Sequence, residues 1–539
     1  MKKLFGILLF FVLSFVLDGQ DPEQVFLFSD RSLYISGEKI RFSAVMISSG
    51  NAVSNVLYVE LISPGGTRIT GGKFLLDGSV AASALTIPQE VITGIYFLRA
   101  YTRYMRNDRS LTYHIIRIVN PYRNEVIAGR SDSSSISENA VMVKNDFFRI
   151  MLDNEIVAPG DTLHAIIQKE KNDSVMLSSV SAQPANLPED SLMIVSKQSD
   201  ERRYYDPEKD GVFLSGIVRD SGGNPAPGIR VNLSVLGRGQ DFMAVQTDTA
   251  GRFEFYLRGY EGKRDLFLAP ENTDRSLIIL ADNDFSTAPV SIRWGSFSLT
   301  EEERIAALKM ARNFQVDSLF YKKAEHEPDT ASAKDFVPFY GTPDEVIDID
   351  SYIQLPTLEE YFNGLPTLVK VRKKGTRKYF KVMGNQPELA SLDPLVMVDL
   401  VAIDDPEKIL AINPRDLKRI EIINAVYLKG DQLYGGIINL VSRKGDFAGI
   451  NLPGSGLFLS YSFPEKKRDI HERQFVPGMP DTRNTVLWIP ELKISDESAI
   501  EIVAPAAPGK YEIIVKGVTK DLKLFRAKAF FEVISKNRK

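Results

Sequence analysis

Residues Pro394 to Gly445 read PLVMVDLVAIDDPEKILAINPRDLKRIEIINAVYLKGDQLYGGIINLVSRKG. Short apolar runs alternate here with capping and turn residues, which is typical of small units that mix strands with a helix. The pattern predicts, in order, a strand, a short helix, a strand, a turn and a strand: Pro394–Asp399, Asn413–Leu417, Ile420–Ile423, Tyr434–Gly436 and Ile437–Val441. The stretch therefore predicts an α/β domain. Asp399, Asn413 and the glycine pair fit capping and turn roles in it.

This stretch resembles the plug domain of TonB-dependent outer-membrane receptors, which fills a large membrane barrel, and the resemblance extends over 379–450. Two features depart from the family: Val398-Asp399-Leu400 replaces its "VDG", and NAVYLKGDQLYG is longer than its usual run before "YG". The chain ends at Lys539, which leaves too few residues for a barrel of about 22 strands of roughly 9–11 residues each. We therefore expect a plug-like domain without its own barrel, and no TonB-driven transport by this chain alone.

The composition is that of a folded protein of several domains. The chain has 539 residues, of which 44% are hydrophobic and 25% are charged; this length predicts roughly three to five domains. The net charge of −4 gives no reason to expect a nucleic-acid partner, which needs a strongly basic face. The chain has no cysteine, which excludes disulfides, thiol catalysis, cysteine-type zinc sites and a lipoprotein anchor.

The N-terminus resembles a targeting segment. Lys2 and Lys3 precede the apolar run Leu4–Leu17, as in a secretory signal peptide, and we predict cleavage near Gly19 or Gln20. The alternative is an uncleaved anchor helix, but the run is shorter than the roughly 20 residues that span a bilayer. We expect an exported protein, in the periplasm or at the cell surface and associated with the outer membrane. Its mature chain has no predicted transmembrane segment.

Short strand-like runs separated by turns predict β-sandwiches before the α/β domain. FSDRSLYISGEKIRF (Phe28–Phe42) and GIYFLRAYTRYMRN (Gly94–Asn107) resemble the MG2 domain of α2-macroglobulins. The thioester trap of that family needs a cysteine, so we do not expect it here. A polar linker is predicted at Gly129–Asn139. Beyond it, IVAPGDTLHAIIQ (Ile156–Gln168) repeats the pattern of Tyr34–Met46 and predicts a second MG-like sandwich.

A third sandwich is predicted from Leu214. The strings Gly216–Asp220, Pro225–Val231 and Thr247–Phe253 resemble a carboxypeptidase-regulatory-like domain, with glycines and prolines at turn positions. This resemblance implies a fold only, because such a domain contains no peptidase site despite its name.

Helical elements are predicted between this sandwich and the α/β domain. Leu299–Phe314 predicts a helix with a capping box formed by Thr300 and Glu303, and four apolar residues share much of one face. Those four residues are Ile305, Leu308, Met310 and Phe314. A proline-rich section follows and ends in a short helix near Leu358–Phe362. Strand-like runs return in Asp481–Val533 and predict a last sandwich.

The predicted fold class is mainly β: tandem Ig/MG-like β-sandwiches with an inserted TonB-plug-like α/β domain and a helical connector. The predicted order is signal peptide 1–20, MG2-like sandwich 21–125, linker 126–140, second MG-like sandwich 141–200, carboxypeptidase-regulatory-like sandwich 211–292, helical and proline-rich connector 298–378, plug-like domain 379–450 and C-terminal sandwich 476–539.

No pattern predicts catalysis. The four histidines, His114, His164, His326 and His471, are scattered, and neither a G-x-S-x-G elbow nor a phosphate loop occurs. The acids of Asp344–Asp350 and Asp404-Asp405 lack the spacing of a calcium loop. The basic run Lys370–Lys381 could contact lipid phosphates, although a solvated face or a partner contact fits it better. We predict no catalytic, cofactor-binding or metal-binding residue, no cofactor and no enzyme activity.

These observations lead to one main functional hypothesis. The chain is expected to dock, through Tyr379–Gly449, on an outer-membrane β-barrel transporter or secretion channel, which it gates or scaffolds. The alternative is a cell-surface module that binds glycans or peptides. A hydrolase with an unrecognised site is a third possibility.

Overall fold

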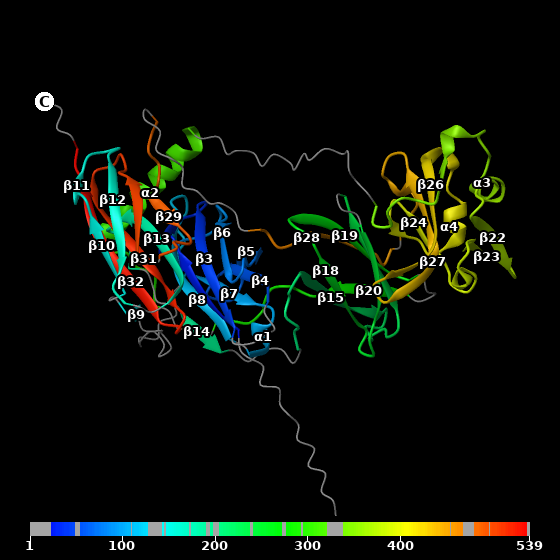
Figure 1. The fold of residues 1–539 in the computed structure, drawn as a ribbon, viewed down its shortest axis with the longest axis horizontal. Helices are drawn as coiled ribbons and strands as arrows, with labels where there is room; N and C mark the ends of the chain where they lie inside the picture. The colour runs from blue at the N-terminus through cyan, green and yellow to red at the C-terminus, as the bar shows by residue number, and fades with distance from the viewer. Residues whose placement is uncertain are drawn as a thin grey trace, which may run out of the picture.

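The computed structural model is a row of four units along its longest axis (Figure 1). It describes residues 23–48, 54–108, 110–127, 143–144, 147–171, 174–189, 194–197, 204–237, 241–271, 276–290, 292, 295–320, 338–452, 454–466, 479–494 and 496–535. The predicted signal peptide (1–20) and the linker stretch Gly129–Asn139 lie outside them. The described strands form eight sheets of two to six strands, with few helices. The protein is therefore mainly β, with several β domains.

The first sandwich contains most of the predicted MG2-like region. One sheet has the order β1-β3-β6 and the other β14-β8-β7-β4-β5, with β2 parallel to β8. The bounds are β1 Glu23–Ser29, β2 Leu33–Ile35, β3 Lys39–Ser48, β4 Val56–Ile62, β5 Arg68–Leu75, β6 Val80–Thr86, β7 Gly94–Thr102, α1 Met105–Asp108, β8 Ser110–Val119 and β14 Ile194–Lys197. Every residue of β4 and β7 is buried, because this sheet is covered on both faces.

The second MG-like sandwich and the C-terminal sandwich, predicted as separate domains, are a single discontinuous sandwich. Its sheets have the orders β10-β12-β30 and β11-β32-β31-β13-β29, and β9 pairs with β32. The bounds are β9 Val143–Lys144, β10 Phe148–Leu152, β11 Ile156–Val157, β12 Thr162–Lys169, β13 Val175–Pro184, β29 Leu487–Ile489, β30 Glu497–Val503, β31 Gly509–Thr519 and β32 Leu524–Val533. The prediction of two domains was wrong because an alternating pattern shows which face of a strand is buried and not which strand pairs with it.

The central sandwich contains the predicted carboxypeptidase-regulatory-like region. Its sheets have the orders β18-β15-β20 and β17-β16-β19-β28, so a strand from beyond the α/β domain completes it. The bounds are β15 Gly211–Asp220, β16 Arg230–Leu236, β17 Asp241–Gln246, β18 Arg252–Arg258, β19 Lys263–Pro270, β20 Leu277–Ala281 and β28 Leu457–Ser462. Gly251 shows why the turn strings hold glycine: its φ is 71°, and a Cβ there would lie 2.8 Å from the nitrogen of Ala226.

Helix α2 (Glu301–Phe320) confirms the predicted helix and its capping box, although it ends six residues later than expected. The amide of Glu303 donates to the Thr300 hydroxyl (3.2 Å), and the Thr300 amide donates to the Glu303 carboxylate (2.8 Å). The predicted apolar face was half wrong, because Ile305 and Leu308 are 53% and 60% exposed. Met310 is buried as predicted, together with three alanines, which allow close approach to β2 of the first sandwich.

The predicted connector 298–378 is therefore divided between two units. Helix α2 lies at the end of the row far from the α/β domain (Figure 1), whereas the residues from Glu345 onward belong to that domain. Among the described residues, no helix is long and apolar enough to cross a membrane.

The α/β domain has a five-stranded mixed sheet of order β21-β26-β27-β24-β25 and a separate two-stranded hairpin, β22–β23. Its elements are β21 Glu345–Asp348, η2 Ile349–Ser351, α3 Leu358–Gly364, β22 Val369–Lys374, β23 Arg377–Val382, η3 Pro387–Ala390, β24 Leu395–Val398, β25 Val401–Ala402, α4 Pro406–Leu410, η4 Pro414–Asp416, β26 Leu417–Lys429, β27 Gln432–Ser442 and η5 Phe447–Gly449. The predicted strands and both short helices have counterparts in this set.

The turn predicted at Tyr434–Gly436 is not there. These residues lie inside β27, and the chain reverses instead at Gly430-Asp431. The glycine pair lies opposite a register shift of β26 between Ile423 and Val426. A Cβ at Gly435 would lie 2.6 Å from the Leu392 carbonyl oxygen, and one at Gly436 would lie 2.8 Å from Val382. The two glycines are thus needed for close packing in a strand.

Candidate functional site: the cleft beside the β22–β23 hairpin

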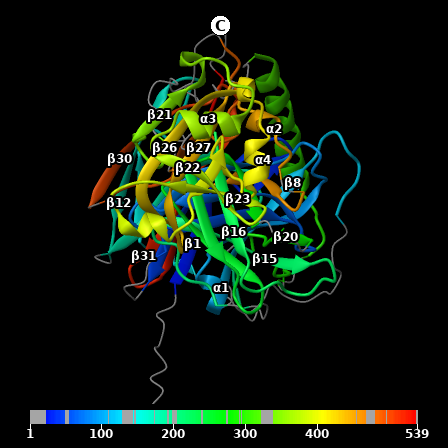
Figure 2. The ribbon, with the colours of Figure 1, turned by 90° about the vertical axis from the view of Figure 1, so that its right-hand side faces the viewer.

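A cleft of about 800 Å³ opens between the α/β domain and the central sandwich. One wall is the run Arg377–Phe380 of β23, and the other is Ser391–Val396, which leads into β24. Arg230 and Glu271 extend the lining from the central sandwich. Figure 2 views the molecule from this end and shows β22 and β23 in front of β16.

The cleft has a fixed geometry because the hairpin β26–β27 docks against the edge strand β17. The amide of Asp431 donates to the Ala244 carbonyl (3.1 Å), and the Asp431 carboxylate accepts from the Gln246 amide (3.1 Å). Lys429 pairs with Asp241 at 2.7 Å. Gly430 makes this approach possible, because a Cβ there would lie 1.9 Å from the Ala244 carbonyl oxygen.

Two polar groups in the cleft are buried and lack a hydrogen-bond partner within the described chain: the Tyr434 hydroxyl and Nε of Arg230. Burial raises the pKa of Tyr434, which keeps its hydroxyl protonated. Nη2 of Arg230 pairs with Asp404 at 2.7 Å, so only part of that guanidinium is engaged. Both atoms lie beneath the lining of the cleft and are shielded from solvent, so neither is exposed to an incoming acceptor.

The basic run Lys370–Lys381 forms the β22–β23 hairpin, with its turn at Gly375-Thr376. Lys378 pairs with Glu359 at 2.8 Å, and Lys381 pairs with Asp393 at 3.2 Å. Four other exposed cations, Arg372, Lys373, Lys374 and Arg377, make no ion pair with any described residue. The tip of the hairpin therefore has uncompensated positive charge next to the cleft.

The polar residues singled out in the α/β sequence have structural roles. The Asp399 carboxylate accepts from the Ser442 amide (2.8 Å), the Ser442 hydroxyl (2.6 Å) and the Phe447 amide (3.0 Å). Asn413 caps η4, and Asp405 caps α4. These side chains hold the ends of strands and helices together and do not line a common pocket.

The acids of Asp344–Asp350 are similarly engaged. Asp344 accepts from the Asn424 amide (2.9 Å), Asp348 caps η2, and Asp350 pairs with Arg443 at 2.6 Å. In the described part of the chain, no three His, Cys, Asp or Glu side chains gather as metal ligands would.

The histidines do not come together in the described structure. Nε2 of His114 lies 3.0 Å from the hydroxyl of Ser29 in the first sandwich, and His114 is buried. His164 is exposed on β12 of the discontinuous sandwich, 3.8 Å from Glu501. His326 and His471 lie outside the described residues.

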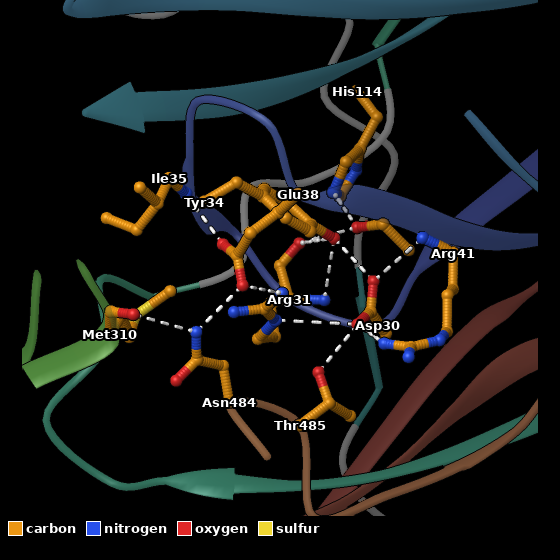
Figure 3. Close-up of polar contacts among 11 residues, drawn as sticks. Asp30, Arg31, Tyr34, Ile35, Glu38, Arg41, His114, Met310, Asn484 and Thr485 are labelled. Carbon is orange, nitrogen blue, oxygen red and sulfur yellow. Dashed lines mark hydrogen bonds and ion pairs between the residues drawn. The ribbon is translucent and has the colours of Figure 1, made fainter. Parts of the chain in front are cut away.

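The MG2-like string Phe28–Phe42 forms a buried polar cluster that sequence reasoning did not foresee (Figure 3). Asp30 accepts hydrogen bonds from the Tyr34 hydroxyl (2.6 Å), the Arg41 amide (3.0 Å) and the Thr485 hydroxyl (2.6 Å). Glu38 accepts from the Ile35 amide (2.6 Å) and from the Asn484 amide group (2.8 Å). The cluster thus ties the first sandwich to the segment that precedes β29.

Electrostatics explain why this cluster tolerates burial. Desolvation alone would raise the pKa of the fully buried Asp30, but the guanidiniums of Arg31 and Arg41, together with the hydrogen bonds from Thr485 and Tyr34, outweigh it and hold that pKa below its usual value. Arg31 also pairs with Glu38 at 3.2 Å and lies 4.6 Å from the centre of the Tyr34 ring. The two carboxylates are balanced by the guanidiniums of Arg31 and Arg41, so the cluster is a structural junction, and Nη1 of Arg31 is buried without a hydrogen-bond partner in the described chain.

Another buried carboxyl group lies between the first and central sandwiches. Glu208 accepts from the Tyr58 hydroxyl (2.9 Å) and from the Phe213 amide (3.0 Å). Burial raises the pKa of Glu208 to about 7. Tyr58 and Phe213 also line a cavity of about 500 Å³ with Arg103 and Arg106. The cations of this cavity have acidic or aromatic neighbours, such as Glu254 at 2.8 Å from Arg103, so the site is close to charge balance.

Comparisons with known proteins give only distant structural likenesses. No family model matches the chain, and no curated protein matches it. Trypsin-activated α2-macroglobulin from Escherichia coli has 8% identity and a TM-score of 0.24 over 95% of this chain and 42% of that one. Methylamine-reacted Salmonella α2-macroglobulin has 10% identity and a TM-score of 0.23 over 95% and 39%. The Yersinia pseudotuberculosis adhesin InvE has 12% identity and a TM-score of 0.12 over 51% and 63%. The chain thus spans about two fifths of the α2-macroglobulins, and nothing about its function follows from likenesses this weak.

Proposed function

We propose that this chain is a non-enzymatic, exported adapter that docks on an outer-membrane β-barrel transporter or secretion channel through its α/β domain, and gates or scaffolds it. One observation carries the proposal. The α/β domain lies at one end of a row of sandwiches (Figure 1), and its cleft is lined by two exposed cations, Lys374 and Arg377, that have no ion-pair partner in the described chain. An open, charged surface of this kind is more typical of a binding site for another macromolecule than of an enclosed active site.

The way the α/β domain is held supports an adapter role. The contacts of Asp431 with Ala244 and Gln246, together with the Lys429–Asp241 pair, fix this domain to the central sandwich. Continuous cores and the cluster of Asp30 and Glu38 hold the sandwiches to one another. A stiff row can keep a docked partner at a set distance from whatever the other end contacts.

The choice of a barrel partner rests on the resemblance of Pro394–Gly445 to a receptor plug. The strand, short helix and strand pair predicted from that stretch are present as β24, η4 and the β26–β27 pair. The outer-membrane location rests on the same resemblance and on the N-terminal targeting pattern.

Co-purification tests the proposal. The tagged full chain is purified in detergent from outer membranes of the native host, and bound proteins are identified by mass spectrometry. We expect a β-barrel protein to co-purify with the wild type and to be lost with Lys374→Glu/Arg377→Glu. The matched control is Lys418→Glu/Lys444→Glu, which reverses two exposed cations of the same domain away from the cleft. If no barrel protein co-purifies, or if both double variants retain it equally, the proposal is wrong.

A further inference from the structure

The hairpin β22–β23 has a free strand edge that faces the cleft. Lys374 and Arg377 flank its two-residue turn and therefore form a hydrogen-bonded pair of the antiparallel ladder. Along such a ladder, hydrogen-bonded and non-hydrogen-bonded pairs alternate. The bond from the Met383 amide to the Leu368 carbonyl (2.6 Å) continues this alternation at the open end of the hairpin. Lys378 and Phe380 belong to the intervening pairs, so their N–H and C=O groups point away from β22.

These backbone groups have no hydrogen-bond partner among the described residues. Both Lys378 and Phe380 line the cleft, and so do the neighbouring residues Arg377 and Tyr379. Consecutive residues of one strand line a cleft together when it runs along the edge of that strand. Phe380 is buried, whereas Lys378 is only half-buried, so the N–H and C=O groups of Lys378 are the ones that another chain could reach along this edge.

The side chains around this edge specify the chemistry of a partner. Lys374 and Arg377 line the cleft without an ion pair in the described chain, and Arg372 lies on the adjacent strand. Leu433 also lines the cleft and is 56% exposed. An extended segment that alternates acidic and apolar side chains would complement the cations with one face and Leu433 with the other.

We infer that the cleft binds an extended acidic segment of a partner protein, which adds to the free edge of β23 as a further strand. The inference rests on the proposed function, because it specifies which part of a docked partner the α/β domain contacts. Anionic lipid would also meet the cations, but a lipid headgroup makes no use of paired N–H and C=O groups along a strand. The observations therefore favour a polypeptide.

The test measures binding of a labelled peptide by fluorescence anisotropy to the full chain without the predicted signal peptide. The probe is the blocked peptide Glu-Val-Glu-Val-Glu-Val-Glu. Two control peptides replace every Glu by Lys, or carry N-methyl groups that block the backbone donors. We expect only the unmodified acidic peptide to bind.

Two proline variants separate strand pairing from charge. Lys378 and Lys373 face each other in a non-hydrogen-bonded pair, so proline at either position removes an outward N–H without breaking the hairpin ladder. We expect Lys378→Pro to weaken binding about tenfold and Lys373→Pro to change it less than about twofold. Lys378→Ala controls for the lost ion pair with Glu359 and should also change binding less than about twofold.

Equal binding of the N-methylated or lysine peptide would overturn the inference, as would equal affinities of the two proline variants. Binding of phosphatidylglycerol vesicles with no binding of the acidic peptide would overturn it in favour of a lipid surface. If a barrel protein still co-purifies with Lys378→Pro, the inference is wrong while the proposed function stands. If the peptide binds and no barrel protein co-purifies, only the barrel proposal is lost.

Discussion

The hydroxyl of Thr485 donates a 2.6 Å hydrogen bond to the carboxylate of Asp30, which lies 455 residues away in the sequence. Both residues are buried. The bond joins the first sandwich to the segment that leads into β29, so it contributes to holding two units of the row together (Figure 3).

Thr485→Val should destabilise the protein, because valine keeps the shape of threonine and leaves a buried carboxylate with one donor fewer. We expect a loss of about 1–3 kcal/mol in the free energy of unfolding, measured by urea denaturation. Thr376→Val, in the exposed turn of β22–β23, is the control and should change it by less than about 0.5 kcal/mol. Equal losses in the two variants would show that the bond contributes nothing specific.

Glu208 should make stability depend on pH near neutrality. Burial raises its folded-state pKa from 4.5 to about 7, so between these values the folded state holds a proton that the unfolded state has released. Stability should therefore fall as pH rises from 4.5 to 7, by at most about 1.4 kcal/mol per pH unit from this group. The melting temperature of Glu208→Gln should be less sensitive to pH across this window. An unchanged pH profile would contradict the assignment.

Gly430→Ala should loosen the α/β domain from the central sandwich. Its φ is 65°, and the added Cβ would lie 1.9 Å from the Ala244 carbonyl oxygen. Gly375→Ala is a matched control, because Gly375 has a φ of 64° and a methyl group added there would have no heavy atom within 4 Å. We expect faster amide hydrogen exchange in β17 and in the β26–β27 hairpin for Gly430→Ala alone. Similar exchange in both variants would indicate backbone strain and not a lost contact.

The buried face of α2 can be tested by two substitutions at neighbouring positions. Ala307→Leu adds a large side chain where the helix packs closely on the first sandwich, and overpacking of this kind typically costs about 1–3 kcal/mol. Leu308→Lys places a charge on the exposed face and should change the free energy of unfolding by less than about 0.5 kcal/mol. Thermal unfolding of both variants tests which face is buried. If the face predicted from the sequence were buried, Leu308→Lys would destabilise the protein more than Ala307→Leu.

Local features of this fold were predictable, and long-range pairings were not. Thr300 and Glu303 identified the start of α2 because a capping box depends on four consecutive residues. The pairing of His164 with Glu501 was not predictable, since nothing in either strand specifies its partner. Gly435 and Gly436 were assigned to a turn because glycine serves turns and tight strand packing equally well.

The candidate site shows the same division. The basic run Lys370–Lys381 was visible in the sequence, and its turn residues Gly375-Thr376 are compatible with a hairpin. The cleft could not be predicted, because its second wall and Arg230 come from distant parts of the chain. The free groups of Lys378 and Phe380 become apparent only when the hydrogen-bonded positions of the hairpin are known.

The discontinuous sandwich has a consequence for biosynthesis. Strands β12 and β13 are translated before the central sandwich and the α/β domain, but their partners β30 and β31 are translated after both. Until then both strands have open edges, and the central sandwich and the α/β domain must be made in the interval. A chain of this design would gain from a chaperone that shields those edges during synthesis.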